Sequence, residues 1–353
     1  MYVQPFIIPF FLRQSGCPHR CVYCDQSASG GHRISDLTPD SVCLDIETGL
    51  SSRRRTAYQP VEIAFFGGTF TGMSRNRQAE LLAAVEPFIR DGRVDGIRLS
   101  TRPDCLDKDM VDFLKTRHVT VIEIGVQSMD DKVLGSSGRG YSARTVLEAS
   151  QTVRDTGMTL GWQLMPGLPG EDQGSRETTI AQTLAARPDQ VRIYPLLVLD
   201  RTPLAAMYNQ GEYRPLELDE AVRITADMFE QFTSAGIRII RMGLQQESGL
   251  EEHVLAGPMH PAFGHLVKGE VFYRALHHAV TKVPAADSPP EIRCAPNDVP
   301  LAVGHRRINI TRLEKTIGSA TLKIKADRAL PSGRFIWQGK IMNAFPQNKE
   351  VAA

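Results

Sequence analysis

Three cysteines lie close together near the start of the chain. Cys17, Cys21 and Cys24 belong to the stretch SGCPHRCVYCDQ (residues 15–26) and make up half of the six cysteines in a chain of 353 residues. A soluble protein has three common uses for such a cluster: a disulfide, a zinc site or an iron–sulfur cluster. These thiols are therefore the first candidates for chemistry in this sequence.

The first residues, MYVQPFIIPFFLRQ, are apolar but do not form a signal peptide. They have no basic n-region, Pro9 interrupts the apolar run, and no small-residue cleavage site follows. The run is also far shorter than the roughly 20 apolar residues of a membrane span. We therefore expect a cytoplasmic protein with no membrane association. Thiols stay reduced in that compartment, which argues against a disulfide between Cys17 and Cys24.

Zinc and iron–sulfur chemistry both remain open for the three thiols. A structural zinc ion takes four N or S ligands, and His19 or His32 could supply the fourth. Zinc ligands usually come in two separated pairs, however, whereas these thiols share one loop with the spacing C-x3-C-x2-C. A cubane iron–sulfur cluster suits one loop, because its irons are close neighbours and each takes one thiolate. Three thiolates would leave one iron open to an exchangeable ligand.

The rest of the chain must position this loop, and its pattern predicts an α/β fold. Apolar strand-like runs alternate with amphipathic helical patterns, which is typical of βαβ units around a parallel sheet. Strands are predicted at 3–12, 61–68, 96–103, 119–128, 158–167 and 190–199, and helices at 39–51, 77–92, 107–117, 142–157 and 175–188. Six such units predict a partial (β/α)6 TIM-like barrel, with a small C-terminal α+β extension.

The later residues predict where the barrel ends. A longer helical pattern covers 217–236, a further strand follows at 237–245, and the Pro-rich stretch 283–292 has the composition of a linker. We therefore expect three parts: the barrel, a segment packed on it and a small basic α+β tail. Their predicted bounds are 1–236, 237–282 and 283–353.

Loops that follow the strands of a parallel sheet meet at its carboxyl edge, where α/β barrels place their sites. The cysteine loop follows the first predicted strand. The stretches GGTFTG, STRPD, GVQS and MPGLPG follow or end the next four strands. We therefore expect one site at this edge of the sheet.

The C-x3-C-x2-C spacing, with Tyr23 just before its last cysteine and a Gly67-Gly68 turn after the second strand, resembles the radical S-adenosylmethionine (SAM) superfamily. The resemblance implies a [4Fe–4S] cluster on the three cysteines, with SAM on the fourth iron. It further implies reductive cleavage of SAM to a 5′-deoxyadenosyl radical. A one-electron donor, such as a flavodoxin or a ferredoxin, would then be a partner.

The resemblance also implies cofactor contacts after the first strands. The glycine turn would approach the amino group of SAM, and polar strand-end residues would approach its carboxylate and ribose. The expected contact residues are Tyr23, Gly67, Gly68, Thr69, Ser100, Thr101, Arg102, Gln127 and Gln163. No residue is assigned to the substrate; the candidates for a catalytic role are Tyr194, His260 and His265.

Within the superfamily, five stretches together resemble the Elongator catalytic-subunit branch, which is close to oxygen-independent coproporphyrinogen III oxidase-like proteins. These stretches are VEIAFFGGTFTGM, STRPD, EIGVQSMDDKVL, LMPGLPGED and VRIYPLLVL. The likeness covers roughly residues 3–328. Two departures limit it. Only 353 − 236 = 117 residues follow the barrel, which leaves no room for the acetyltransferase domain of that branch. The oxidases carry another cysteine two positions after the third, where this chain has Gln26.

The charge distribution favours RNA as the substrate. From Thr281 onward the chain has 12 Lys+Arg and 6 Asp+Glu, a balance of +6, whereas the remainder has 41 − 12 = 29 basic and 40 − 6 = 34 acidic residues. Basic side chains make sequence-independent phosphate contacts. The expected contacts are Arg306, Arg307, Arg312, Lys315, Lys323 and Lys325, with Arg53–Arg55 as an extension.

We therefore expect a radical SAM enzyme that modifies RNA, with a tRNA nucleoside as its target. The alternative is a radical SAM oxidoreductase or transferase with a small-molecule substrate, including a coproporphyrinogen oxidase-like activity. A nucleic-acid-binding protein with a merely structural metal is a third reading, but it leaves the gathering of unusual residues at one sheet edge unexplained.

Overall fold

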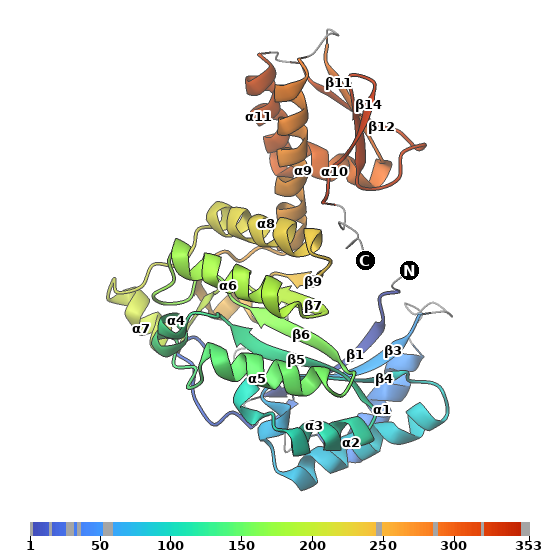
Figure 1. Ribbon diagram of the computed structural model, residues 1–353, viewed down its shortest axis with the longest axis vertical. Helices are drawn as coiled ribbons and strands as arrows, with labels where there is room; N and C mark the ends of the chain where they lie inside the picture. Colours follow the sequence, from blue (N-terminus) through green and yellow to red (C-terminus); the bar gives the residue numbers. More distant parts are fainter. Residues whose placement is uncertain are drawn as a thin grey trace. The chain divides into compact units, whose positions relative to one another are not determined.

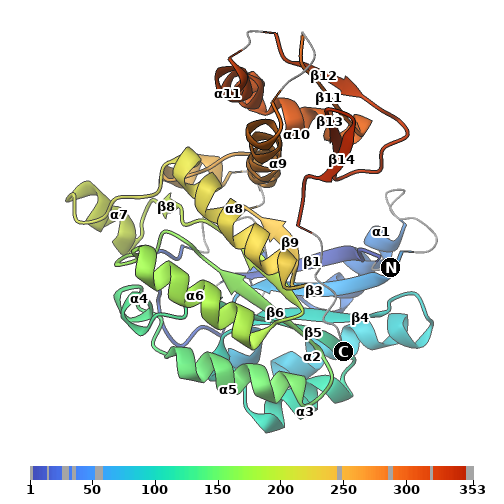
Figure 2. The same cartoon turned by 45° about the horizontal axis from the view of Figure 1, so that its top comes forward.

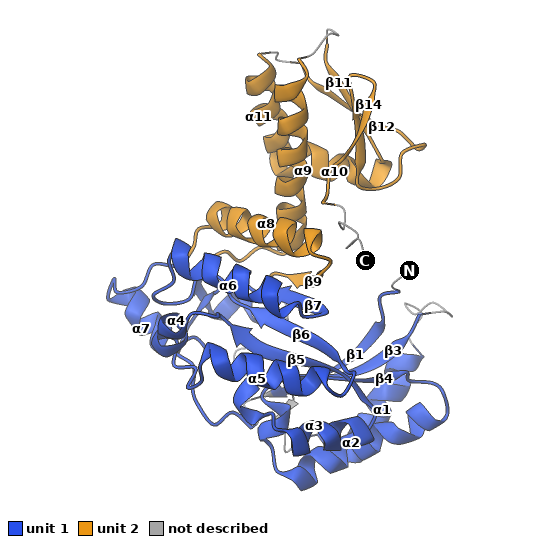
Figure 3. Cartoon of the chain, viewed as in Figure 1, with its two compact units in different colours: residues 1–215, 245–257 blue, residues 216–244, 258–353 orange. Residues whose placement is uncertain are grey.

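The computed structural model forms two compact units (Figure 3). Unit 1 comprises residues 1–215 and 245–257, and unit 2 comprises 216–244 and 258–353. The division into 1–236, 237–282 and 283–353 stays a prediction. The residues that the structure describes are 3–13, 16–25, 32–33, 37–51, 59–244, 249–284, 289–318 and 321–346.

Unit 1 is built on a parallel sheet that curls into part of a barrel (Figure 1). Its strands follow the order β2-β1-β3-β4-β5-β6-β7, and each pair along it is parallel. The predicted α/β class and partial barrel are therefore confirmed. The strands are β1 Phe6–Arg13, β2 His32–Arg33, β3 Val61–Gly67, β4 Gly96–Thr101, β5 Val119–Gln127, β6 Thr159–Leu164 and β7 Gln190–Ile193.

Helices alternate with these strands, and α2, α3, α5 and α6 form a layer along one face of the sheet (Figure 2). Each begins where a side-chain oxygen accepts a hydrogen bond from an N–H of the first turn that has no partner within the helix. The capping residues are Thr38, Ser74, Asp107, Asp130, Ser142, Asp172 and Thr202. The helices are α1 Pro39–Leu50, α2 Arg75–Arg90, α3 Lys108–Thr116, α4 Asp131–Ser136, α5 Ala143–Arg154, α6 Gln173–Ala186 and α7 Pro203–Asn209.

The predicted strand at 190–199 is shorter in the structure. β7 ends at Ile193, because Pro195 has no N–H with which to continue the ladder. The residues beyond it form the short strand β8 (Val198–Leu199), which pairs antiparallel with β10 (Val254–Ala256). Neither α4 nor α7 was expected from the sequence, since each is too short to show a helical period.

The strand register aligns the carboxyl ends of the strands at one edge of the sheet. Parallel strands carry evenly spaced hydrogen bonds, and the register shifts in the β4–β5 and β5–β6 pairs are local irregularities. The pairs at this edge are Leu12 with Gly67, Thr101 with Ile124, Gly125 with Gln163, and Gln163 with Arg192. Residues far apart in the sequence therefore end in one row, and the loops that follow them start from the same edge.

Aromatic side chains fill the inner part of this unit. The rings of Phe10 and Phe65 have centroids 5.6 Å apart, and those of Phe65 and Phe70 are 5.2 Å apart. All three are almost completely buried, and burying one such side chain stabilises the fold by roughly 1.5–3 kcal/mol. The indole of Trp162 is also buried and donates to Ser150 Oγ at 3.0 Å.

Unit 2 contains both helices and a small sheet of its own, as predicted for the C-terminal α+β extension. Its helices are α8 Leu218–Ser234, α9 Phe263–Lys282, α10 Val299–Val303 and α11 Ile308–Ile317. Strand β9 (Arg238–Met242) follows α8. A separate sheet has the order β12-β11-β13-β14, formed by β12 Lys323–Ala326, β11 Glu291–Cys294, β13 Arg334–Trp337 and β14 Lys340–Asn343.

The long helix α9 was not predicted, because prolines and histidines at its start read as a turn. In the structure its apolar side chains, Phe272 and Leu276 among them, pack with Phe335 and Trp337 in the core of unit 2. Among the described residues, no helix is long and apolar enough to cross a membrane.

Candidate active site at the carboxyl edge of the sheet

The cysteine loop is held from two sides within unit 1. On one side Gly16 lies against the turn after β3, where a Cβ would come within 2.2 Å of the carbonyl oxygen of Thr69. With a φ of +71° as well, this position admits only glycine. On the other side the N–H of Val22 donates to Ser137 O at 3.1 Å, and its carbonyl accepts from Leu204 N at 2.8 Å.

The three cysteines differ in their surroundings. Cys17 and Cys24 are exposed, whereas Cys21 is buried. The Sγ of Cys17 lies 3.1 Å from Thr69 Oγ1, and the N–H of Cys24 donates to Cys21 O at 3.1 Å. Thr69, an expected cofactor contact, therefore lies directly beside one of the expected cluster ligands.

A buried arginine that the sequence did not single out connects this loop to β5. Arg139 Nη1 lies 3.1 Å from Cys21 Sγ and 3.0 Å from the hydroxyl of Tyr23. Its Nη2 donates to Gly125 O at 2.7 Å, and its Nε donates to the hydroxyl of Tyr141 at 2.6 Å. Hydrogen bonds to ligand sulfurs and nearby charge are the means by which proteins set the properties of an iron–sulfur cluster.

The two tyrosines around Arg139 are neutral hydrogen-bonding groups. Burial raises the pKa of Tyr23 well above its ordinary value, although Arg139 opposes the shift. Burial also raises the pKa of Tyr141 to about 12. Tyr23 therefore contacts the guanidinium group beside Cys21 as a phenol.

The glycine turn at the end of β3 keeps backbone groups close to the edge of the sheet. Gly67 has a φ of +97°, and a Cβ there would lie 3.1 Å from Leu12 O. The N–H of Gly68 donates to that same oxygen at 2.8 Å. The turn therefore has the conformation that its glycines predict, and Gly67 is exposed at the edge.

The strand-end residues of β4 are buried, and their polar atoms already have protein partners. Thr101 Oγ1 lies 2.5 Å from the hydroxyl of Thr71. Arg102 forms a two-pronged ion pair with Asp104, at 2.9 and 2.8 Å, and donates to the carbonyl of Arg139. In this structure Arg102 supports the segment that carries Arg139, and its contact with a cofactor stays a prediction.

Gln127 is the clearest candidate for a ligand contact. It is only 8% exposed, has a left-handed φ of +68° and carries a buried Oε1 without a hydrogen-bond partner among the described residues. Buried acceptors are normally satisfied, so an unpaired one at a predicted site is what a polar ligand would explain. Nearby in the strand register, Gln163 Nε2 donates to Ser100 Oγ at 3.1 Å.

A buried ion-pair network lies on the strands and was not predicted from the sequence. Glu123 accepts from Arg98 at 2.7 Å and from Arg192 at 2.5 and 2.9 Å. Burial alone would raise the pKa of Glu123, but the arginines, Arg192 foremost, lower it overall. Arg192 also lies 3.2 Å from the hydroxyl of Tyr194, a predicted catalytic candidate. The missed signal was a charged residue between apolar neighbours in each of three strands: Arg98 in β4, Glu123 in β5 and Arg192 in β7.

The histidine candidates lie in different surroundings from the cysteines. His260 and His265 belong to unit 2, where His260 Nδ1 accepts from Ala262 N at 3.1 Å. The structure therefore gathers the cysteine loop with the expected cofactor residues in unit 1, and a catalytic role for either histidine stays a prediction. The side chain of His32, considered for zinc, lies outside the described residues.

The described residues contain no group of three His, Cys, Asp or Glu side chains placed to share a single metal ion. An iron–sulfur cluster sets a different requirement, because each cysteine binds its own iron. Three observations fit a cluster with a bound polar cofactor: three cysteines on one anchored loop, Arg139 against Cys21, and the unpaired oxygen of Gln127.

Comparison with known proteins places the chain in a family. Residues 12–182 match the radical SAM superfamily model, and residues 188–272 match the radical SAM C-terminal domain. The chain therefore belongs to the radical SAM superfamily, whose enzymes use a [4Fe–4S] cluster and SAM. The resemblance in the cysteine motif is confirmed.

The relatives include Elongator-like enzymes. The chain is 34% identical over 249 residues to a tRNA uridine(34) acetyltransferase of Methanocaldococcus infernus, covering 59% of this chain and 46% of that enzyme. It is 29% identical over 230 residues to an uncharacterised protein of Methanocaldococcus jannaschii, covering 62% and 69%. The structure of the M. infernus Elp3 has a TM-score of 0.62 at 21% identity, over 77% of this chain and 64% of that one, and shows the shared fold. The resemblance to the Elongator branch is thus confirmed, and the matched part is less than half of that acetyltransferase.

The loop after β6 contains a carboxyl group that titrates near neutrality. Glu171 accepts from Gly167 N at 2.9 Å and lies 3.4 Å from Arg176 Nη1. The hydroxyl of Tyr213 donates to Gly167 O at 2.6 Å, so the MPGLPGE loop is closed from two sides. Burial raises the pKa of Glu171 to about 7, against the opposing effects of Gly167 N–H and Arg176.

We predict that Glu171→Gln stabilises the protein at high pH. Because folding raises the pKa of Glu171 from 4.5 to about 7, its contribution to stability is complete below pH 4.5 and is lost as the pH rises through 7. The full cost of ionisation is roughly 3 kcal/mol. Thermal unfolding of Glu171→Gln should show a gain of about 1–3 kcal/mol over wild type at pH 8.5 and little at pH 5. The exposed Glu177→Gln is the control, and an equal gain at both pH values would contradict this prediction.

A second prediction concerns Arg139. The positive charge beside Cys21 should stabilise the reduced cluster, which carries one more electron. In anaerobically reconstituted protein, Arg139→Gln should therefore lower the reduction potential of the cluster, and Arg139→Lys should lower it less. Redox titration followed by electron paramagnetic resonance (EPR) provides the measurement, with Arg176→Gln as a control. An unchanged potential in Arg139→Gln would show that the contact is only structural.

Proposed function

We propose that this protein is a radical SAM enzyme that modifies RNA, with a tRNA nucleoside as its target. The observation that carries the proposal is the similarity to tRNA uridine(34) acetyltransferases over the radical SAM region. Because that similarity covers 46% of the acetyltransferase, the proposal concerns the radical step on RNA and leaves the fate of the modified nucleoside open.

In this proposal Cys17, Cys21 and Cys24 hold the [4Fe–4S] cluster. When bound, the cluster and SAM supply one-electron chemistry that generates a 5′-deoxyadenosyl radical for hydrogen abstraction. Arg139 fixes the sulfur of Cys21, and the buried position of Cys21 and Tyr23 keeps water away from that side of the loop. A one-electron donor such as flavodoxin or ferredoxin would approach from outside the barrel.

Protein groups near the cysteine loop would orient SAM. The Gly67-Gly68 turn offers backbone groups at the sheet edge, and Gln127 offers an unpaired acceptor for an ammonium or hydroxyl group. Ser100 and Gln163, which contact each other, would supply further polar contacts. Tyr194 lies at the end of β7, where its hydroxyl is held by Arg192, and it remains the candidate in unit 1 for contact with substrate.

The basic side chains of unit 2 would supply phosphate contacts, although two of the six predicted ones have partners already. Arg312 pairs with Glu270 at 2.7 Å, and Lys325 pairs with Glu291 at 2.6 Å. The other four are exposed and, within the part of the chain that the structure describes, have no acidic partner. They are Arg306, Arg307, Lys315 and Lys323. Arg53–Arg55 lie outside the described residues.

We predict that Cys21→Ala abolishes cluster loading and SAM cleavage together, because a three-thiolate site cannot lose one ligand and keep its cluster. Iron and sulfide content, visible absorbance and 5′-deoxyadenosine release provide the readouts. Cys43→Ala is a matched control, since Cys43 is a half-buried cysteine of α1 whose Sγ donates to Ala84 O at 3.5 Å. Full activity in Cys21→Ala would rule out the cysteine assignment.

The substrate class is tested by measuring 5′-deoxyadenosine release from reduced, reconstituted protein given SAM, with and without unfractionated tRNA. We expect tRNA to stimulate release well above the slow background. Release that is indifferent to tRNA would favour the small-molecule alternative, coproporphyrinogen oxidase-like chemistry included. Heat-denatured tRNA and DNA of equal charge serve as controls for non-specific stimulation.

A further inference from the structure

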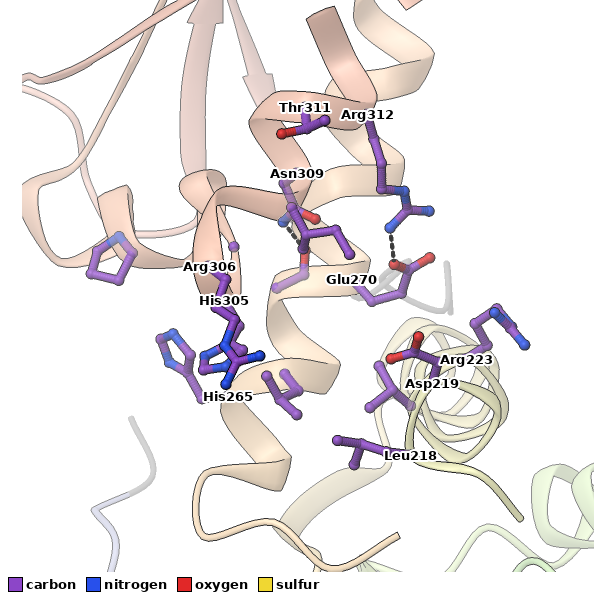
Figure 4. Close-up of a pocket in the computed structure, with 16 residues that line it drawn as sticks. Leu218, Asp219, Arg223, His265, Glu270, His305, Arg306, Asn309, Thr311 and Arg312 are labelled. Carbon is purple, nitrogen blue, oxygen red and sulfur yellow. Dashed lines mark hydrogen bonds and ion pairs between the residues drawn. The ribbon is translucent and has the colours of Figure 1, made fainter. Parts of the chain in front are cut away.

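A pocket of about 540 Å³ lies within unit 2, remote in sequence from the cysteine loop (Figure 4). Three segments line it: the first turns of α8, the first turns of α9 and the stretch 300–312 that leads into α11. The volume is within the roughly 300–1,000 Å³ range of small-ligand sites. None of the roles proposed for unit 1 uses this pocket.

The lining combines apolar surface with positively charged or titratable side chains. Leu218 and Val222 of α8 and the exposed Ile308 of α11 supply aliphatic surface. His265, His305 and Arg306 lie together on one side of the pocket, and Arg223 extends from α8 on the other (Figure 4). Imidazole and guanidinium planes are surfaces on which unstacked RNA bases bind, and the same groups donate hydrogen bonds to phosphate.

The charges of the pocket favour an anion. Glu270 is compensated, because Arg312 contacts it at 2.7 Å and Arg274 at 3.3 Å. Among the described residues, Arg223 and Arg306 have no acidic partner, and the exposed Asp219 is the one uncompensated acid of the lining. The pocket thus offers two guanidinium groups without an acidic partner among the described residues, with two histidines beside that of Arg306, against one exposed carboxylate.

The backbone beside the pocket is held in an uncommon conformation. Arg306 and Arg307, with φ values of +50° and +63°, are consecutive non-glycine residues in the left-handed region. Such residues cost free energy and persist where surrounding structure fixes them. Here Asn309 fixes the segment, since its buried Nδ2 donates to Gly269 O and Leu301 O, each at 3.0 Å. The position of Arg306 is therefore set by the fold.

We propose that this pocket binds one nucleotide of an RNA strand, with the phosphate at Arg306 and His305 and with the ribose and base over Leu218, Val222 and Ile308. The inference rests on the proposed RNA substrate and deepens it, because it names a docking site in unit 2. It assigns Arg306 as a direct contact to the phosphate of that nucleotide and Arg223, on the other side of the pocket, as a contact to the next phosphate of the strand, in contrast to exposed cations elsewhere on the unit.

RNA binding to the full chain tests the proposal. Fluorescence anisotropy over a salt series would measure the binding of unfractionated tRNA and of a labelled single-stranded oligoribonucleotide. Neither measurement requires a loaded cluster. The variants are Arg306→Asn, because Asn tolerates a left-handed φ, and Arg223→Gln, because Gln suits an exposed helix position. Arg328→Gln removes an exposed cation that does not line the pocket and is the charge-matched control.

Each pocket variant should weaken binding about fivefold and reduce the slope of log K against log salt by about 1, while Arg328→Gln changes neither. Arg306→Lys should keep the salt slope. Wild-type affinities and slopes in both pocket variants would overturn the inference. Competition by uridine monophosphate as strong as that by tRNA would assign the pocket to a free nucleotide instead and would also overturn it.

The outcomes separate this inference from the proposed function. If tRNA binds through Arg306 and Arg223 but does not stimulate 5′-deoxyadenosine release, the binding role of the pocket is supported and the proposal that tRNA is the substrate is contradicted. If tRNA stimulates 5′-deoxyadenosine release while the pocket variants bind tRNA normally, tRNA remains the proposed substrate and the binding role of the pocket is contradicted. If wild-type protein shows no saturable tRNA binding at low salt, both fall.

Discussion

The parallel register of the sheet in unit 1 is the constraint on which the candidate site depends. Once Leu12 pairs with Gly67 and Gly125 pairs with Gln163, loops that are distant in the sequence must begin at one edge. The cysteine loop has little regular structure of its own, so its position follows from the strands that precede and flank it. Burial of the aromatic core, including Phe65, supplies the free energy that holds this register.

Side-chain contacts connect the cysteine loop to the residues at this edge of the sheet. Arg139 joins Cys21 to β5 through the carbonyl of Gly125, and Arg102 supports the backbone of Arg139 itself. Through this one guanidinium group, a change on β5 can therefore reach the sulfur of Cys21, a proposed cluster ligand. Arg139 thus contacts the buried Cys21, whereas Cys17 and Cys24 are exposed, which suits the proposed role of the loop in holding a cluster that exchanges electrons and ligands.

The sequence was sufficient for the fold class and for the cysteine loop, because apolar strand runs, helix caps and cysteine spacing are local signals. It was insufficient for Arg139, a lone arginine in the stretch GSSGRGYS, whose meaning appears only when its burial against Cys21 is seen. The network around Glu123 was missed for the same reason, although a charge within an apolar strand is a usable warning. Helix α9 was missed because Pro258 and Pro261 precede it and suggested a turn.

The central claim is that three cysteines hold a cluster whose fourth iron is open to SAM. EPR spectroscopy of the reduced, reconstituted protein is the sharpest test. Spectra are recorded before and after addition of SAM that is labelled with ¹⁵N and ¹⁷O in its methionine part. If SAM binds the open iron, the cluster signal should change and should show hyperfine coupling to the labelled amino and carboxylate groups. A reducible cluster whose signal does not respond to SAM, or a chain that binds zinc in place of iron at these cysteines, would contradict it.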